Sequence, residues 1–469
     1  MPWRYRLRKP PLLDECEVPP EVFQGGIERL AEFARPFAEC RVRREQTDHA
    51  RTDLAGLVSD LGHQNAESIA DRHDPDRHGL PHVVGSSTWD HRPWIREWAG
   101  QVGRQIGTPD GVIVFDPSGF AKTGDTSVGV PRPGRGRLGK VDHGQVGVFR
   151  AYASTREHAL VDVRLSRPRA WAKDRARRQR CGIPQSARYR TRHERALEML
   201  QEIGPRRPHA WVTGDDAMGR SSRFRAQRRR RDEPDLLAVP SNTTVGDLEG
   251  AVPEWSGRGP HPKRAFEPVR ARSRARPAGA WRRIPVGDGE RGPQFVERVA
   301  TRVVARTDRG RIGPEEPLVV IRSTDEGGAA RHDDDLSGAP PERLPGVRAR
   351  VAVAEPRVER CRPPGQSEAG PADYQVRTYS GWHHHQAWSL IAGWFLVQES
   401  RRGEKVAPAL TVPPVRAGLA SWLRSACRCD EPERVASDRK RWLMRTALAR
   451  FYRWKKCKRL APLRKRLLS

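Results

Sequence analysis

Several features that mark other protein classes are missing from this sequence, and each absence narrows its function. No apolar run approaches the roughly 18 residues that a membrane-spanning helix needs, so we expect a soluble protein with no membrane partner. No apolar signal core follows the basic residues 1–11, which indicates a cytoplasmic location. Only seven cysteines occur, and the single C-x-C has no second pair at zinc-ligand spacing, so free thiols are expected.

Acidic residues are also few beside basic ones. Fifty-eight Asp and Glu residues face 87 Lys and Arg residues, which leaves a formal net charge of +29. A charge of this size favours a polyanionic partner, most simply nucleic acid, because neutralising phosphates releases counterions. A GC-rich genome, which encodes arginine often, would raise the same total without any binding function.

Residues 1–108 have the apolar spacing of helices. Phe23, Ile27 and Leu30 recur at helical intervals, and further apolar sets follow in the same region. Basic residues such as Arg44 and Arg51 lie among them. We therefore predict a helical N-terminal domain, which either contacts DNA or supports the rest of the fold.

Residues 109–243 alternate short β-branched runs with helical segments. Strands are expected at residues 112–116, 145–154, 158–166, 209–215 and 236–241, and helices at residues 186–203 and 221–231. The order of three strands, helix, strand, helix and strand is that of an RNase H-like core. The predicted fold class is therefore α/β, with a mixed sheet flanked by helices.

The rest of the chain divides by texture into three further regions. Residues 244–350 are rich in Pro, Gly and Arg and predict a β-rich insertion, with strands at residues 281–286, 298–306 and 316–324. Residues 351–400 would return to the core with a well-buried helix at residues 382–397. Residues 401–469 predict a basic helical C-terminal region. After Asp438 this tail has many Lys and Arg, interleaved aromatics and no acidic residue, which suits a helix on a phosphate backbone.

Two aspartates fall at matching places in the predicted core. Asp116 ends the first expected strand and Asp215 ends the fourth, and these strands are neighbours in an RNase H-like sheet. Converging carboxylates repel one another, and a hard cation such as Mg²⁺ resolves the repulsion. Two such ions about 3.5–4 Å apart can activate a water or a 3′-hydroxyl and stabilise the leaving oxygen of a phosphodiester. Each aspartate alone would fit an ordinary turn or cap residue equally well.

Two other patterns suggest chemistry less specifically. His383, His384 and His385 are consecutive on an expected helix, so they point in different directions and cannot chelate one ion together. Core packing or DNA contact is the better interpretation of these histidines. The glycines of PRPGRGRLGK (residues 131–140) lack the Walker spacing, which favours a flexible basic hairpin over a phosphate cradle.

Seven segments of the sequence form a further pattern: FDPSGFAKTG (115–124), SVGV (127–130), GRLGKVDHGQVGVF (136–149), WVTGDDAMGRSSRFR (211–225), LLAVPSNT (236–243), YQVRTYSGWHHHQAWSLIAGWFL (374–396) and RFYRWKK (450–456). They resemble the core motifs of DDE transposases of bacterial insertion sequences, in the subgroup with a β-rich insertion between the second Asp and the Glu. The resemblance runs from about residue 25 to the end. It implies that Asp116 and Asp215 are the first two catalytic metal ligands.

The resemblance places the third ligand at Glu359. The family has a helix of the form R-W-x-I-E-x-x-F-x-x-x-K, and EPRVERCRPPGQ (355–366) stands at that place, fifteen residues before Tyr374. The sequence departs from the pattern there, with Glu355, Pro356 and Gln366 on the family's Arg, Trp and Lys. Pro363 and Pro364 also fall inside the expected helix, where proline lacks an N–H and clashes with the preceding turn. Glu368 is a less well placed substitute.

The resemblance also implies the cofactor, the partners and the reaction. It implies two Mg²⁺ ions, which Mn²⁺ could replace, and double-stranded DNA, namely the element ends and the target, bound by a homodimer near the bacterial nucleoid. The expected DNA contacts are Lys122, Arg137, Lys140, Arg220, Arg223, Arg453, Lys455 and Lys456. The expected function is a transposase that cleaves DNA and transfers strands. The alternative is a decayed relative that binds DNA but does not cut it, and a ribonuclease with the same core is a third, weaker option.

Overall fold

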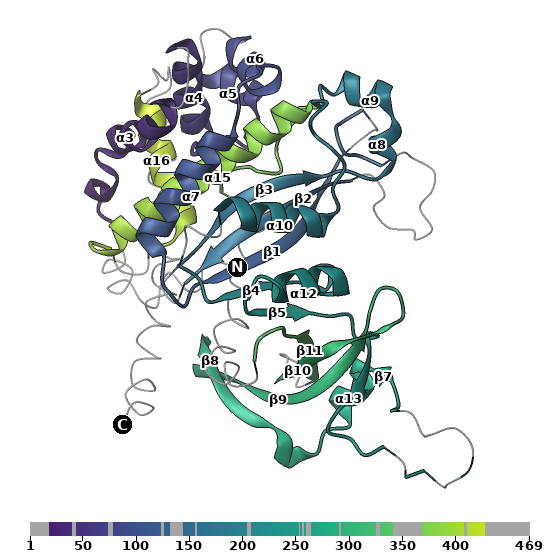
Figure 1. Cartoon of the computed structure of the whole chain (residues 1–469). Helices are drawn as coiled ribbons and strands as arrows, with labels where there is room; N and C mark the ends of the chain where they lie inside the picture. Colours follow the sequence, from purple (N-terminus) through teal and green to yellow (C-terminus); the bar gives the residue numbers. More distant parts are fainter. Residues whose placement is uncertain are drawn as a thin grey trace.

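The computed structural model describes residues 18–39, 44–73, 78–122, 126–131, 144–154, 157–203, 208–252, 254–255, 258, 264–289, 292–324, 329–340, 368–407 and 410–426. Figure 1 shows a helical lobe, a sheet below it and a further group of strands that continues from that sheet. The strands are β1 (Val112–Ala121), β2 (Gly144–Ala153), β3 (His158–Ser166), β4 (Trp211–Gly214), β5 (Asp235–Ala238), β6 (Thr244–Asp247), β7 (Glu267–Pro268), β8 (Arg282–Gly289), β9 (Gly292–Arg306), β10 (Ile312–Thr324) and β11 (Ala330–Leu336). The helices are η1 (Pro20–Phe23), α3 (Gly26–Glu39), α4 (Arg44–Leu57), α5 (Ala66–His73), α6 (Gly79–Gly85), α7 (Arg92–Ile106), α8 (Ala170–Lys173), α9 (Arg175–Arg180), α10 (Arg192–Ile203), α11 (Asp216–Gly219), α12 (Ser222–Arg229), α13 (Val269–Arg274), η3 (Ala278–Ala280), α15 (Tyr379–Glu404) and α16 (Val412–Ala426).

One mixed sheet joins these strands in the order β3-β2-β1-β4-β5-β11-β10-β9-β6-β7, with β8 also paired to β9. β1, β2 and β3 are antiparallel neighbours, whereas β4 runs parallel to both β1 and β5. With α10 before β4 and α12 before β5 in the chain, this is the predicted RNase H-like order. The parallel strands β4 and β5 are almost fully buried, as expected of strands covered on both faces. The α/β fold class with an RNase H-like core is therefore confirmed.

The helix predicted at residues 186–203 begins later than expected, at Arg192. Contacts of the Arg167 guanidinium explain this later start. Its Nη2 donates to the carbonyl oxygens of Ala187 and Arg188, at 2.8 and 2.7 Å, so these carbonyls serve a tertiary contact. The intervening residues consequently form turns and irregular chain.

The insertion after β5 extends the sheet of the core. β11 pairs with β5 in antiparallel fashion, with Leu336 opposite Leu237. A buried ion pair adds to this junction, because Nε of Arg225 in α12 lies 3.1 Å from Oε1 of Glu316 in β10. The three strands predicted for the insertion correspond to β8, β9 and β10. The insertion also contains β6, which begins at Thr244 and pairs with β9.

The N-terminal helices pack around α15, which lies far away in the sequence. α15 contacts α4, α6, α7, α16 and β3, and Figure 1 shows it crossing the helical lobe beside α7. The ring of Trp388 packs against that of Trp94 at 4.1 Å between centroids, and Phe395 packs against Phe33 at 5.3 Å. The predicted buried helix at residues 382–397 is confirmed, and it extends at both ends. Among the described residues, no helix combines the length and the apolarity that crossing a bilayer requires.

The three histidines of α15 pack in this core. All three are buried, and their ring nitrogens face backbone carbonyl oxygens. His383 Nδ1 donates to the carbonyl of Tyr379 at 2.9 Å, and His385 Nε2 donates to that of Gly370 at 3.0 Å. Burial lowers the pKa of His383 to about 3 and that of His385 to about 4, so both rings are neutral near pH 7. The prediction of core packing is confirmed.

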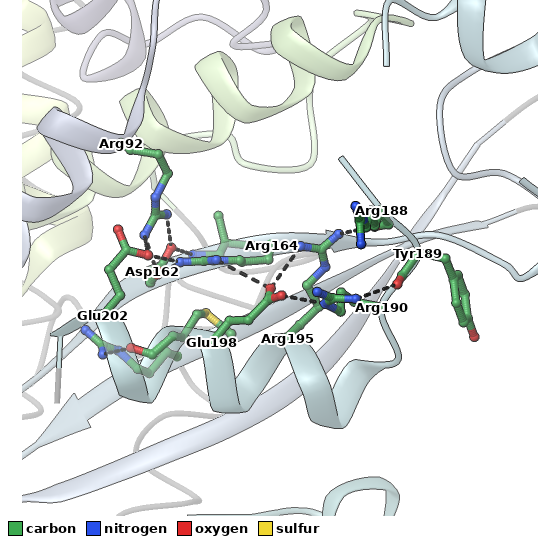
Figure 2. Close-up of polar contacts among 12 residues, drawn as sticks. Arg92, Asp162, Arg164, Arg188, Tyr189, Arg190, Arg195, Glu198 and Glu202 are labelled. Carbon is green, nitrogen blue, oxygen red and sulfur yellow. Dashed lines mark hydrogen bonds and ion pairs between the residues drawn. The ribbon is translucent and has the colours of Figure 1, made fainter. Parts of the chain in front are cut away.

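A cluster of charged side chains joins the helical lobe to the sheet. Asp162 of β3 is fully buried, and Figure 2 shows Arg92 and Arg164 converging on it. Arg92, the first residue of α7, contacts Asp162 (Nη1–Oδ1 2.9 Å) and Glu202 of α10 (Nη2–Oε2 2.8 Å). Burial by itself raises the pKa of Asp162, but the charges of Arg92 and Arg164 outweigh it and hold the pKa well below its usual range. The first turn of α7 is thereby fixed on both β3 and α10.

Candidate active site

Asp116 lies in the middle of a strand and not at its end. The sequence predicted that β1 stops at Asp116, whereas it continues to Ala121 and stays paired with β2 throughout. On its other side β1 pairs with β4 only as far as Phe115, opposite Gly214. Asp116 is therefore the first residue of β1 beyond the end of β4. Its side chain is 5% exposed, and Oδ2 accepts a hydrogen bond from Ser118 Oγ at 2.9 Å.

Asp215 occupies the next position on the neighbouring strand. It directly follows β4, so it continues the register in which Phe115 lies opposite Gly214. Neighbouring strands lie about 4.8 Å apart, which brings the backbones of Asp116 and Asp215 side by side. Oδ1 of Asp215 accepts from the backbone N–H of Met218 at 3.1 Å and caps α11. The structure thus places the two predicted aspartates next to each other.

Close packing fixes the turn that carries Asp215. A Cβ on Gly219 would lie 1.9 Å from the carbonyl oxygen of Ala238, so only glycine lets α11 rest directly on β5. A Cβ on Gly214 would lie 2.9 Å from the carbonyl oxygen of Phe115. Both glycines come from the motif around Asp215, and both allow the close packing that fixes the backbone of this turn.

A carboxylate used as a cap retains the capacity to bind a cation. It offers two oxygens with about four lone-pair directions, so one hydrogen bond orients the group without exhausting it. The donor set formed by Asp116 and Asp215 consists of hard oxygens, which is the chemistry that Mg²⁺ selects. Within the described ranges, no group of three His, Cys, Asp or Glu side chains is placed to hold a metal ion. Glu359, the predicted third ligand, lies outside the described residues.

Glu368, the weaker candidate for a third ligand, has a contact elsewhere. Its Oε2 pairs with Nη1 of Arg416 in α16 at 3.1 Å, and its carbonyl oxygen accepts from Gln64 Nε2 at 3.2 Å. These contacts attach Glu368 to the helical lobe.

The predicted DNA-contacting residues differ in their surroundings. Lys122 is half-buried, donates to the carbonyl of Tyr374 at 2.6 Å and lies 3.3 Å from the centroid of its ring. Burial lowers the pKa of Lys122 to about 8. Arg220 and Arg223 are exposed, as phosphate contacts must be. The remaining five, Arg137, Lys140, Arg453, Lys455 and Lys456, lie outside the described residues.

Ser118 is the residue near the site that the sequence analysis did not single out. Its hydroxyl holds Oδ2 of Asp116, and this position is available because residues two apart in a strand point to the same side. Because Asp116 was interpreted as the last residue of its strand, Ser118 was not expected to lie on the same side of that strand.

Comparison with known protein families identifies the family of the chain. The chain matches the sequence model of the family described as DDE superfamily endonuclease over residues 36–293, which is more than half of its length. The chain belongs to this family. A search among curated proteins finds no match to it. Membership of the DDE superfamily implies an enzyme of the nuclease type with DNA as its substrate, and the matched range includes both Asp116 and Asp215.

Proposed function

We propose that this member of the DDE superfamily is a transposase, which binds the ends of an insertion sequence and catalyses DNA cleavage and strand transfer. The observation that supports the proposal best is that Asp116 and Asp215 directly follow Phe115 and Gly214, the last paired residues of β1 and β4. The net charge of +29 provides affinity for duplex DNA. Two copies would act together on paired ends, and the cytoplasm next to the nucleoid would be the site of action.

Asp116, Asp215 and Glu359 would hold two Mg²⁺ ions. When bound, these ions would activate the attacking water or 3′-hydroxyl and stabilise the leaving oxygen of the phosphodiester. The protein itself orients its carboxylates before the metal ions bind. Ser118 orients Asp116, the N–H of Met218 orients Asp215, and burial at 5% exposure keeps bulk water away from Asp116. Preset ligands need little reorganisation when the substrate arrives.

The direct test is cleavage of DNA that carries the sequences flanking the gene. With Mg²⁺ the protein should nick at the element boundary, and it should leave a duplex with scrambled ends intact. Chelation by EDTA should abolish nicking, and Mn²⁺ should restore it, because the carboxylates alone supply no Lewis acid. If the wild type binds the ends but no divalent metal supports nicking, the transposase proposal is wrong for this copy.

That second outcome would match a decayed relative that binds DNA without cutting it. The specific observation in its favour is the departure around Glu359, where Pro363 and Pro364 interrupt the expected helix. In that case, Pro363→Ala and Pro364→Ala with Gln366→Lys should restore some nicking, since they return the segment to the pattern of the family.

Glu359→Gln tests the third ligand. Cleavage should fall by at least about 10²-fold while end binding is unchanged, because one metal ligand loses its charge and nothing else is altered. Glu355→Gln is the matched control, since it removes the same charge four residues earlier and should leave cleavage as in the wild type. Equal cleavage by Glu359→Gln and the wild type would exclude Glu359 from the site.

A further inference from the structure

The connection between β3 and α10 is dense in positive charge. Residues 167–192, which we call the basic platform, contain ten Lys or Arg residues and a single acidic residue, Asp174. The platform includes the two short helices α8 and α9. Neither the proposed metal site nor the predicted DNA contacts include any of its residues.

Four of the ten cations maintain the fold of the platform. Arg167, Arg177 and Arg178 donate to backbone carbonyl oxygens at 2.7–3.2 Å, and Arg190 pairs with Glu198 of α10 at 2.8 Å. Arg177 also lies over the ring of a buried tryptophan, 4.0 Å from its centroid. These contacts show that the platform has a defined local structure, which its own side chains stabilise.

The other six cations are exposed, and within the described part of the chain none of them forms an ion pair with an acidic side chain. They are Arg169, Lys173, Arg175, Arg180, Arg188 and Arg192. Like charges at this density repel one another, and the repulsion lowers the stability of the isolated protein. A polyanion relieves it, so this arrangement is favourable when such a partner is bound.

The platform lies at the edge of the sheet that is formed by the carboxyl ends of β1, β3 and β4, and the candidate active site lies at the same edge. Ser166, the last residue of β3, pairs with Val146 of β2, which in turn pairs with Gly119 of β1. Gly119 is three residues beyond Asp116, which is about 10 Å along a strand. Figure 1 shows α8 and α9 beyond the ends of β1, β2 and β3.

Hydrogen bonds fix the platform to this edge. Trp171 Nε1 donates to the carbonyl of Val130 at 2.9 Å, and Cys181 Sγ donates to that of Thr126 at 3.4 Å. The carbonyl oxygen of Cys181 accepts from the N–H of Tyr379, the first residue of α15. The position of the exposed cations relative to Asp116 is therefore set by the core itself.

We propose that the basic platform binds the phosphate backbone of the duplex whose scissile phosphodiester lies at Asp116 and Asp215. This inference rests on the proposed function. A B-form duplex crossing the edge presents its backbone again after about half a helical turn, roughly 17 Å. That spacing suits a surface that begins about 10 Å along the strands and two strands across from Asp116, which is about 14 Å away, and that carries long side chains. Contacts of this kind set the register of the duplex and read no sequence.

The test compares two triple variants with the same loss of charge. Arg175→Gln, Arg180→Gln and Arg188→Gln remove three exposed cations of the platform. Arg104→Gln, Arg230→Gln and Arg231→Gln remove three exposed cations at the opposite edge, close to where β1 and β5 begin. Thermal unfolding of both variants should match that of the wild type, because these side chains lose no carbonyl or core contact. The ion pair that the control variant does lose, Arg104 with Glu97 at 3.1 Å, is exposed and screened by water.

Binding of a duplex of about three helical turns that carries one element end is measured in EDTA over a range of salt concentrations, so that no cleavage occurs. For the platform variant, the slope of log K against log salt should become shallower by about 2.7, or 0.9 for each lost phosphate contact. Its affinity at 0.1 M salt should fall on the order of 10²-fold. The opposite-edge variant should bind as the wild type does.

Equal losses in the two variants would show a general charge effect and overturn the proposal. A wild-type slope in the platform variant would overturn it as well. Both results leave the transposase proposal intact, because that proposal is tested by cleavage. A wild type that binds no duplex at all would overturn both.

Discussion

Replacing Asp116 with Asn is expected to lower Mg²⁺-dependent cleavage by about 10³-fold or more, with duplex binding and thermal stability unchanged. The amide has nearly the same shape as the carboxylate and keeps an oxygen that can accept from Ser118 Oγ, at 2.9 Å in the wild type. It lacks the negative charge that holds a divalent cation. Cleavage of a labelled element end, measured beside binding in EDTA, separates the two properties.

Asp215 allows its two roles to be separated. Asn is as good an N-cap as Asp, so Asp215→Asn should keep the bond to the N–H of Met218 (3.1 Å in the wild type) and the fold of α11. Asp215→Ala also removes the cap, which should destabilise the protein by about 0.5–2 kcal/mol. If Asp215 is a metal ligand, both variants lose cleavage about equally. Full cleavage by Asp215→Asn would show that the residue is only a cap.

Asp216→Asn is the matched control for both aspartates. Asp216 is the next residue, its side chain is 57% exposed, and its nearest basic partner is Arg220 at 3.9 Å. An exposed pair of this kind contributes about 0–1 kcal/mol, so the variant should cleave and melt much as the wild type does. A loss of cleavage as large as that of Asp215→Asn would mean that the whole turn, and not the carboxylate of Asp215, determines activity.

The strand order was predictable because the core strands are short, apolar and rich in β-branched residues. The point at which β1 ends was not predictable. The sequence Asp-Pro-Ser-Gly after residue 115 has the composition of a turn, and proline normally interrupts a central strand. Pro117 is tolerated because β4 has already ended, so β1 has become an edge strand on that side. Only the register between β1 and β4 reveals this.

The insertion was predicted where its strands are apolar and missed where they are charged. β11 contains Asp333, Asp334 and Asp335, residues that are unfavourable in strands. It forms because β10 pairs with it on one side and β5 on the other, and because Ser273 donates a hydrogen bond to the buried side chain of Asp334. Such partners are distant in sequence, so no local pattern predicts the strand.

The candidate site was predictable in part for a related reason. Asp116 and Asp215 belong to strands whose pairing follows from the order of elements, and the sequence alone predicted their adjacency. The basic platform was not predicted, because the sequence shows its ten cations but not which of them are exposed. Only the structure separates arginines that bind carbonyl oxygens, such as Arg178, from exposed ones such as Arg175.

Asp162→Asn should destabilise the protein by about 3–5 kcal/mol, because it removes one partner of a buried ion pair. Arg92 would lose its contact at 2.9 Å and Arg164 its contact at 3.5 Å, and both guanidinium groups are largely buried at 16% and 15% exposure. The neutral amide cannot compensate these charges, and the two arginines would keep only the partly exposed carboxylates of Glu202 and Glu198 as partners. The expected result is a clear fall in the thermal unfolding temperature, in which the contact of α7 with β3 opens first.

Asp60→Asn is the surface control. Asp60 pairs with Arg72 at 2.6 Å, but the two side chains are 30% and 39% exposed. Water and salt screen a pair of this kind, so its loss should cost about 0–1 kcal/mol. If Asp60→Asn and Asp162→Asn melt at the same temperature, the buried cluster does not hold the lobe to the sheet.

The pH dependence of the difference in unfolding temperature between the wild type and Asp162→Asn identifies the cause of that difference. The pKa of Asp162 is held below its ordinary range in the folded protein, so the unfolded chain takes up the proton first as the pH falls. The stabilisation is complete above the ordinary carboxyl pKa of about 4 and is lost as the pH falls toward the folded value. The gap in unfolding temperature between wild type and Asp162→Asn should therefore be constant from pH 7 to pH 5 and shrink below pH 4. A gap that persists unchanged into acid would mean that Asn disturbs packing, since only the charged carboxylate titrates.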